Sequence, residues 1–264
     1  MRRSAMNVAG AAIGVGLVLL LAHGTPANGQ GGAPAPRAAD AKPGDVRVMT
    51  TGAIRTALDA VRAEAEKAIG HPLVIEYGSA RGSTKDEILK GQVFEVAILP
   101  PDVNDELAKA GKITAGRYDI ASVEAAIGLR GDVTPDLSTP AAVKKAMLGA
   151  KSLRWSDTAL VLPAINKLLD TLGIREATKA QHAVPNNVAL GPGDYEMQIY
   201  PLSEILANKN VRNAGPVINE FQVPARLVAT ISTSTPDAKA AMALIKFLQG
   251  PGMGPALKAS GMKR

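Results

Sequence analysis

Apolar residues in the first part of the chain form two kinds of pattern, short extended runs and longer stretches with helical spacing. The extended runs predict strands at 46–49, 73–77 and 94–99. The helically spaced stretches predict helices at 54–69, 84–90 and 102–110, each followed by glycine. Strands that alternate with helices through short links indicate a parallel sheet covered by helices on both faces.

The turns after these three strands meet at one edge of such a sheet, at 50–53, 79–84 and 99–101. Ligands of open α/β sheets collect at this edge. The second turn is rich in small and hydroxylated residues, and free N–H groups at a helix start bind anions. Thr84 and Glu87 have capping-box spacing, which predicts where the helix begins. Taken alone, the segment is also compatible with a capped turn that binds nothing.

The second half of the chain has a less regular pattern. The apolar segment 121–129 predicts one strand that leaves the first unit. Further strands are predicted at 152–155, 195–200 and 227–231, and helices at 140–148, 165–172 and 236–248. Pro163 leaves the start of the 165–172 helix open, since proline inside a helix is costly.

The first 30 residues have the pattern of a secretory signal peptide. Arg2 and Arg3 precede an apolar run at 8–22, and small residues follow. The run of about 15 residues is shorter than the ~20 that span a membrane, so an uncleaved anchor is the weaker alternative. Residues 31–44 are rich in Gly, Ala and Pro and predict a disordered linker.

Charge and composition narrow the class of ligand. The formal net charge is +6, and loss of the signal peptide would lower it by two. A modest positive charge favours a small anionic ligand. Scattered basic residues and 3% aromatic residues argue against nucleic acid.

Residues for catalysis or for a cofactor are not arranged in any familiar motif. The chain has no cysteine, no HExxH, no GxGxxG or Walker loop, and no glycine elbow around a serine. We therefore expect no metal, no cofactor and no disulfide. Asp157 and Glu204 are potential bases, although solvated or capping roles are more common for such residues.

Several short phrases occur in order along the chain: Tyr77-Gly78-Ser79, 91–99, 105–113, 136–140, Trp155-Ser156-Asp157, 202–205, 243–248 and Gly261-Met262. These phrases resemble those of the molybdate-binding-protein-like periplasmic substrate-binding proteins of ABC transporters. Together they extend from Asp45 to Lys263, which is nearly the whole chain after the signal peptide.

This resemblance implies a two-lobed type II periplasmic binding protein fold, α/β, in which each lobe is a mixed, mostly parallel sheet flanked by helices. Lobe one would comprise 45–124 and 228–264, and lobe two 125–227. The resemblance also implies a periplasmic monomer whose partners are a small anionic ligand and an ABC permease in the membrane.

Ligand contacts in the family come from turns at the strand ends of both lobes. Carried onto this chain, those contacts are 51–53, Ser79, the Ser156-Asp157 turn and Tyr200. With the neighbouring residues of the first two turns added, the candidate ligand-binding residues are Thr50, Thr51, Gly52, Ser79, Arg81, Gly82, Ser83, Ser156, Asp157 and Tyr200.

The chain departs from the molybdate pattern at two turns. The family's serine after the first strand is replaced by Gly52 or Ala53, and the second turn carries Arg81 where the family has no charge. Arginine forms a bidentate fork to carboxylates or phosphate-like groups, which predicts a ligand other than molybdate.

Three hypotheses about function follow. The leading one is a periplasmic solute-binding protein that captures a small oxyanion or carboxylate for ABC-type import, and is not an enzyme. The alternative is a periplasmic isomerase of a small tricarboxylate such as aconitate on the same fold. The third is a tethered envelope protein whose cleft is vestigial.

Overall fold

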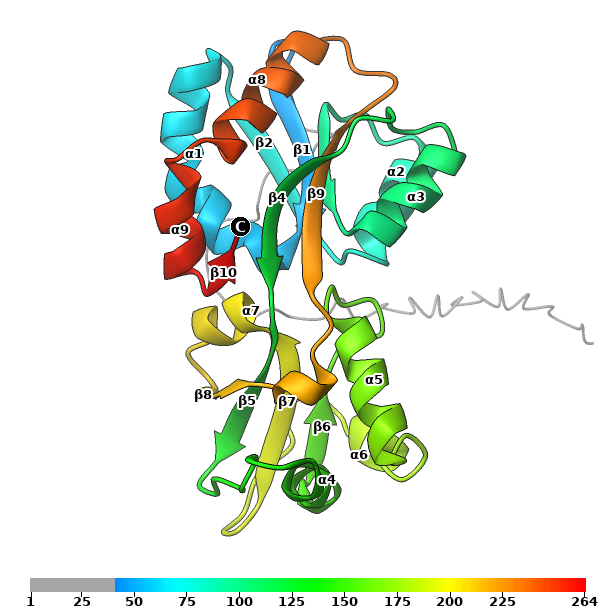
Figure 1. The fold of residues 1–264 in the computed structure, drawn as a ribbon, viewed down its shortest axis with the longest axis vertical. Helices are drawn as coiled ribbons and strands as arrows, with labels where there is room; N and C mark the ends of the chain where they lie inside the picture. The colour runs from blue at the N-terminus through cyan, green and yellow to red at the C-terminus, as the bar shows by residue number, and fades with distance from the viewer. Residues whose placement is uncertain (1–40) are drawn as a thin grey trace, which may run out of the picture. The chain divides into compact units, whose positions relative to one another are not determined.

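The computed structural model describes residues 41–264 (Figure 1). The predicted signal peptide and most of the predicted linker lie outside these residues. The described helices and strands form two sheets flanked by helices, which confirms the α/β class. We call the first sheet with its helices lobe one and the second sheet with its helices lobe two.

Lobe one is built on a sheet with the strand order β10-β4-β9-β3-β1-β2. The strands are β1 (Val46–Thr51), β2 (Leu73–Gly78), β3 (Val96–Leu99), β4 (Tyr118–Val123), β9 (Ala225–Ile231) and β10 (Met262–Lys263). β1 pairs in parallel with β2 and with β3, as the alternating strand–helix pattern predicts. The pairs β3–β9, β4–β9 and β4–β10 are antiparallel, because β9 and β10 return from later parts of the chain.

Helices cover both faces of this sheet. They are η2 (Gly52–Ile54), α1 (Arg55–Ile69), α2 (Ser83–Lys90), α3 (Pro101–Lys109), α8 (Ala238–Gln249) and α9 (Met253–Ala259). α1, α8 and α9 gather on one side of the strands, and α2 and α3 lie on the other (Figure 1). The apolar stripe of each helix therefore meets the buried face of the sheet.

Lobe two is built on a smaller mixed sheet with the order β6-β7-β5-β8. Its strands are β5 (Ala125–Gly131), β6 (Ser152–Arg154), β7 (Tyr195–Pro201) and β8 (Arg212–Pro216). β6 and β7 are parallel, whereas β5 is antiparallel to both β7 and β8. The helices are α4 (Pro140–Gly149), α5 (Leu162–Leu172), α6 (Lys179–His182), α7 (Leu202–Ala207) and η3 (Asn219–Phe221).

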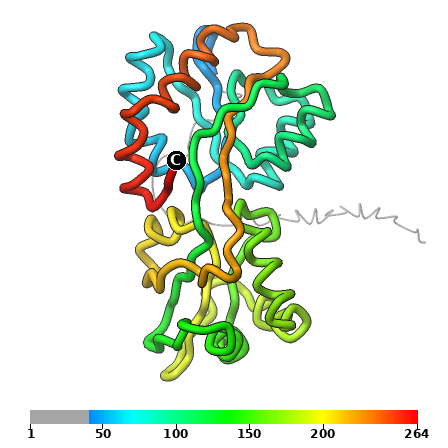
Figure 2. The backbone as a smooth tube through the Cα atoms, in the orientation of Figure 1, coloured from blue at the N-terminus to red at the C-terminus, as the bar shows by residue number. Residues whose placement is uncertain are grey.

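The prediction of one strand at 121–129 is wrong. This segment contains two strands, β4 in the first sheet and β5 in the second, separated only by Glu124. Figure 2 shows the chain passing from one lobe to the other here and returning beside this crossing through β9. Glu124 accepts the Leu202 N–H at its carbonyl, and its carboxylate pairs with Lys263 at 2.6 Å. An apolar run interrupted by a single glutamate can therefore belong to two different sheets.

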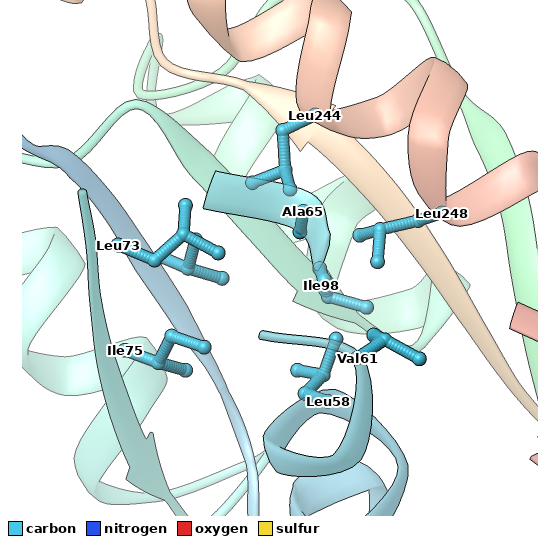
Figure 3. Close-up of a pocket in the computed structure, with 9 residues that line it drawn as sticks. Leu58, Val61, Ala65, Leu73, Ile75, Ile98, Leu244 and Leu248 are labelled. Carbon is cyan, nitrogen blue, oxygen red and sulfur yellow. The ribbon is translucent and has the colours of Figure 1, made fainter. Parts of the chain in front are cut away.

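The core of lobe one lies between the sheet and the helices α1 and α8. Leu58 and Val61 of α1 face Ile98 of the sheet and Leu244 and Leu248 of α8 (Figure 3). A cavity of about 10 Å³ remains among these side chains. It is lined by apolar groups, so it resembles the dry packing defects of protein cores and not a ligand site.

Within residues 41–264, every helix is too short or too polar to span a lipid bilayer.

Candidate functional site

In the turn after β1, Thr50 is buried in lobe one, Thr51 caps η2, and Gly52 lies beside lobe two. The Thr50 side chain is 0% exposed, and its Oγ1 donates to the Ile98 carbonyl at 2.8 Å. The Thr50 hydroxyl therefore lies inside lobe one, although we expected it at the ligand. Thr51 Oγ1 accepts the Ala53 N–H at 3.4 Å and caps η2. Gly52 begins η2 beside lobe two, where an added Cβ would lie 3.6 Å from Glu204 Oε1.

The turn after β2 is held by two serines that cap each other. Ser79 Oγ accepts the Ser83 N–H at 2.9 Å, and Ser83 Oγ accepts the Ser79 N–H at 3.1 Å. The predicted capping box of Thr84 with Glu87 is wrong, because α2 begins one residue earlier at Ser83. Thr84 is buried within the helix, and its hydroxyl donates to the Thr50 carbonyl at 3.0 Å. These bonds tie the turns after β1 and β2 together.

Gly78 and Gly82 let this turn approach its surroundings closely. A Cβ at Gly78 would lie 2.4 Å from Thr84 Oγ1. A Cβ at Gly82 would lie 2.5 Å from Ser79 Oγ and 3.0 Å from the Thr158 methyl group in lobe two. Gly82 therefore allows the two lobes to touch.

Arg81 connects three segments of the molecule. Its Nε and Nη2 each donate to the Asp102 carboxylate at 3.0 Å. Its Nη1 donates to the carbonyls of Ala159 and Leu160 at 2.8 and 3.1 Å, and its backbone N–H donates to the Thr158 carbonyl at 3.2 Å. The carboxylate that the guanidinium fork binds thus belongs to the protein itself. Arg81 is therefore no evidence for a ligand other than molybdate.

The lobe-two turn at Ser156 carries hydroxyl groups toward this contact. Ser156 Oγ lies 3.0 Å from Thr158 Oγ1 and accepts the Thr158 N–H at 3.2 Å. Trp155 before it stacks on His182, with ring centroids 3.9 Å apart. Asp157 is exposed. The stacked ring fixes the backbone from which Ser156 and Thr158 project.

Tyr200 and Glu204 lie at the end of β7 and in the first turn of α7. Both side chains are partly buried. Burial raises the pKa of Glu204 to about 7, against the opposing field of Arg55. Burial, together with the nearby Glu204 charge, also raises the pKa of the Tyr200 hydroxyl. Within residues 41–264 the Glu204 carboxyl group makes no hydrogen bond and no ion pair.

The strand registers bring these turns together in pairs. Thr51 lies opposite Gly78 in the β1–β2 pair, and Arg154 lies opposite Gln198 in the β6–β7 pair. Adjacent strand ends of lobe one therefore face adjacent strand ends of lobe two, through contacts between η2 and α7 and between the β2 turn and Thr158. The structure thus gathers the predicted turns at one interlobe contact.

Sequence reasoning missed three members of this contact. It considered Glu204 only as a possible base, and it left out Thr158 and Asp102. Glu204 sits on a six-residue helix that has no repeating apolar pattern, and Asp102 meets Arg81 across 21 residues of sequence. The one available signal was the Leu202–Ile205 phrase, which contains a carboxylate at Glu204 shortly after a strand end.

Other parts of the described chain are weaker candidates for a ligand or metal site. A polar hollow of about 590 Å³ is lined by Arg130, Gly131, Asp132 and 187–192 in lobe two, away from the predicted site residues. Among residues 41–264, no group of three or more His, Cys, Asp or Glu side chains is arranged to hold a metal ion.

Comparisons of the sequence with known proteins found relatives over most of the chain. The family model described as "Bacterial extracellular solute-binding protein" matches residues 46–263. The molybdate-binding protein ModA of Azotobacter vinelandii is 26% identical over 232 residues, which cover 84% of this chain and 90% of that protein.

Solved structures of binding proteins share the fold. The periplasmic molybdate-binding protein of Azotobacter vinelandii superimposes with a TM-score of 0.66 at 19% identity, covering 83% of this chain and 99% of that one. The sulfate-binding protein SubI of Mycobacterium tuberculosis H37Rv gives a TM-score of 0.62 at 13% identity, covering 83% and 86%. These relatives are described as binding proteins, and the isomerase alternative gains no support from them.

Proposed function

Because the chain belongs to the bacterial extracellular solute-binding protein family, we propose that it captures a small anion between its two lobes for an ABC-type importer. The ligand would be an oxyanion or a carboxylate, and the protein would work in the periplasm as a monomer. The membrane permease of the importer would be its partner. The names of the relatives, which bind molybdate or sulfate, support an oxyanion first.

The observation that carries this proposal is the convergence of hydroxyl and N–H groups from both lobes. Ser79, Ser83, Ser156 and Thr158 bring hydroxyl groups to the two facing turns. The N–H of Ala80 has no acceptor among the described residues. The start of α2 adds the positive end of a helix dipole. Neutral donors of this kind bind an anion without the cost of burying a second full charge.

Arg81 supports the same proposal in another way. Its bonds to Thr158, Ala159 and Leu160 join the lobes beside the facing turns. Hinge closure around a ligand is a common motion of two-lobed binding proteins, and bonds of this kind form only when the lobes meet. We therefore assign Arg81 to closure of the site and not to direct contact with the ligand.

A thermal-shift screen followed by calorimetry tests the proposal. The panel contains molybdate, tungstate, sulfate, phosphate, and di- and tricarboxylates. Ligand at about 100 times its Kd stabilises the folded state by about 2.7 kcal/mol, so one class should raise the melting temperature by several degrees. If no member of the panel raises it, the proposal fails and the vestigial-cleft hypothesis is favoured.

A further inference from the structure

Glu204 is an ionisable group at the interlobe contact, in the first turn of α7. Its carboxyl oxygen lies beside the β1 turn, 3.6 Å from where a Cβ of Gly52 would be. Its carboxyl group makes no hydrogen bond with residues 41–264. A partly buried carboxylate without a partner is costly, and a bound molecule with a donor would remove that cost.

The residues around Glu204 leave its carboxyl group available to accept a hydrogen bond from a ligand. α7 packs against η2, β5, β7 and β8, and its leucines touch Gly261 before β10. Arg55, directly after η2, lies over the Tyr77 ring at 4.0 Å and attracts Glu204 from a distance. Tyr200 on β7 is the neighbouring titratable hydroxyl.

The other charged groups on these elements have partners elsewhere. Glu196 pairs with Arg130 and Arg154, Arg212 bonds to Thr134 and to the carbonyls of Gly131 and Val133, and Lys263 pairs with Glu124. None of these cations therefore neutralises Glu204 by direct pairing.

We propose that Glu204 determines ligand specificity: its carboxylate selects an anion that carries its own hydroxyl or proton and disfavours a fully deprotonated oxyanion. This inference rests on the proposed function. An ionised Glu204 accepts a hydrogen bond from a ligand O–H, whereas it repels an oxyanion that offers only lone pairs. A fully deprotonated oxyanion is bound only when Glu204 itself carries a proton and donates.

The two classes of ligand therefore differ in how their affinity depends on pH. Binding of molybdate takes up one proton at Glu204, so its affinity falls about tenfold per pH unit once Glu204 ionises. Inorganic phosphate keeps one proton at mildly alkaline pH, and L-malate has a hydroxyl that succinate lacks. These ligands retain their affinity, because they supply the donor.

The test is calorimetry on the full mature chain between about pH 7 and about pH 9, with molybdate, phosphate, L-malate and succinate as probes. Glu204→Gln keeps the shape and adds a permanent N–H donor, whereas Glu204→Ala removes donor and acceptor. Glu64→Gln is the matched control, since Glu64 is exposed on α1. Circular dichroism confirms that each variant is folded.

We expect the Glu204→Gln variant to bind molybdate at least about tenfold more tightly than the wild type at the alkaline end, with no dependence on pH. Glu204→Ala also loses the pH dependence, and Glu64→Gln behaves as the wild type. Equal affinity of wild type and Glu204→Gln for every probe at every pH overturns the role of Glu204 alone. Failure of all probes to bind any of these proteins overturns the proposed function as well.

Discussion

Arg81 and Glu204 are two charged side chains at the same interlobe contact, and the protein treats them in opposite ways. The Arg81 side chain is 17% exposed, and it bonds to Asp102 and to two carbonyl groups of lobe two. Glu204 is partly buried and has no hydrogen-bonded partner among residues 41–264. The guanidinium is satisfied by the protein, whereas no residue within 41–264 donates a hydrogen bond to the carboxyl group.

The difference shows why charge alone is a poor guide to a ligand site. From the sequence, Arg81 is the prominent residue, since it stands in a turn where the family has no charge. In the structure its fork is used within the protein. A residue contributes to recognition when its hydrogen-bonding capacity exceeds what its neighbours use, and that property depends on three-dimensional contacts.

The largest effect is expected from Arg81→Ala. Hydrogen bonds to charged groups contribute about 1.5–3 kcal/mol, so loss of the bonds to Ala159 and Leu160 should weaken ligand binding by roughly ten- to a hundredfold. Asp102 is 55% exposed, and exposed ion pairs contribute only about 0–1 kcal/mol. Asp102→Asn should therefore change the affinity much less. Calorimetry on both variants measures the difference.

The role assigned to Arg81, closure of the lobes without contact to the ligand, can be tested directly. Small-angle X-ray scattering with and without ligand shows whether Arg81→Ala fails to close. A variant that closes normally but has lost affinity would mean that Arg81 touches the ligand, as the sequence suggested. Unchanged affinity would remove Arg81 from both roles.

The next largest effect is expected in the unfolding free energy of the ligand-free protein, when Glu204→Gln is compared with the wild type. The pKa of Glu204 is raised from 4.5 to about 7, so the folded state holds a proton that the unfolded state releases between these values. The unfolding free energy of the wild type therefore falls as pH rises through this window. One pKa unit corresponds to about 1.36 kcal/mol, and partial exposure reduces the total to about 1–2 kcal/mol.

Glu204→Gln lacks this loss and should be more stable than the wild type above about pH 7. Urea unfolding at several pH values measures this difference in unfolding free energy. Glu64→Gln provides the matched change on an exposed helix face. Equal pH profiles for wild type and Glu204→Gln would show that solvent or an unseen partner already satisfies the carboxyl group.

Much of lobe one was predictable because its pattern is local. β1, β2 and β3 have alternating or continuous apolar runs, and α1 ends at Ile69 before Gly70, whose φ of 74° favours glycine. Glycine and short apolar runs therefore fixed these boundaries to within a few residues.

Lobe two was less predictable because its elements depend on tertiary contacts. β8 has mostly exposed residues and no apolar alternation, and α7 is shorter than two helical turns. The start of α5 at Leu162, with Pro163 in its first turn, resolves the ambiguity that the proline created. The site shows the same limit: its turns follow from strand ends, but the Arg81–Asp102 pair and the isolation of Glu204 require the fold.

The smallest effect is expected from Ser79→Ala, which tests whether the Arg81 side of the contact also holds the ligand. The variant removes the acceptor of the Ser83 N–H, and loss of one such hydrogen bond costs about 1 kcal/mol of stability. Thr139→Ala is the matched control, since Thr139 Oγ1 accepts the Ala142 N–H at 3.1 Å as the cap of α4 in lobe two. Both variants should lose similar stability in urea, but only Ser79→Ala should weaken anion binding, by severalfold. Equal affinity in both variants would restrict Ser79 to capping and move the ligand toward Gly52 and Glu204.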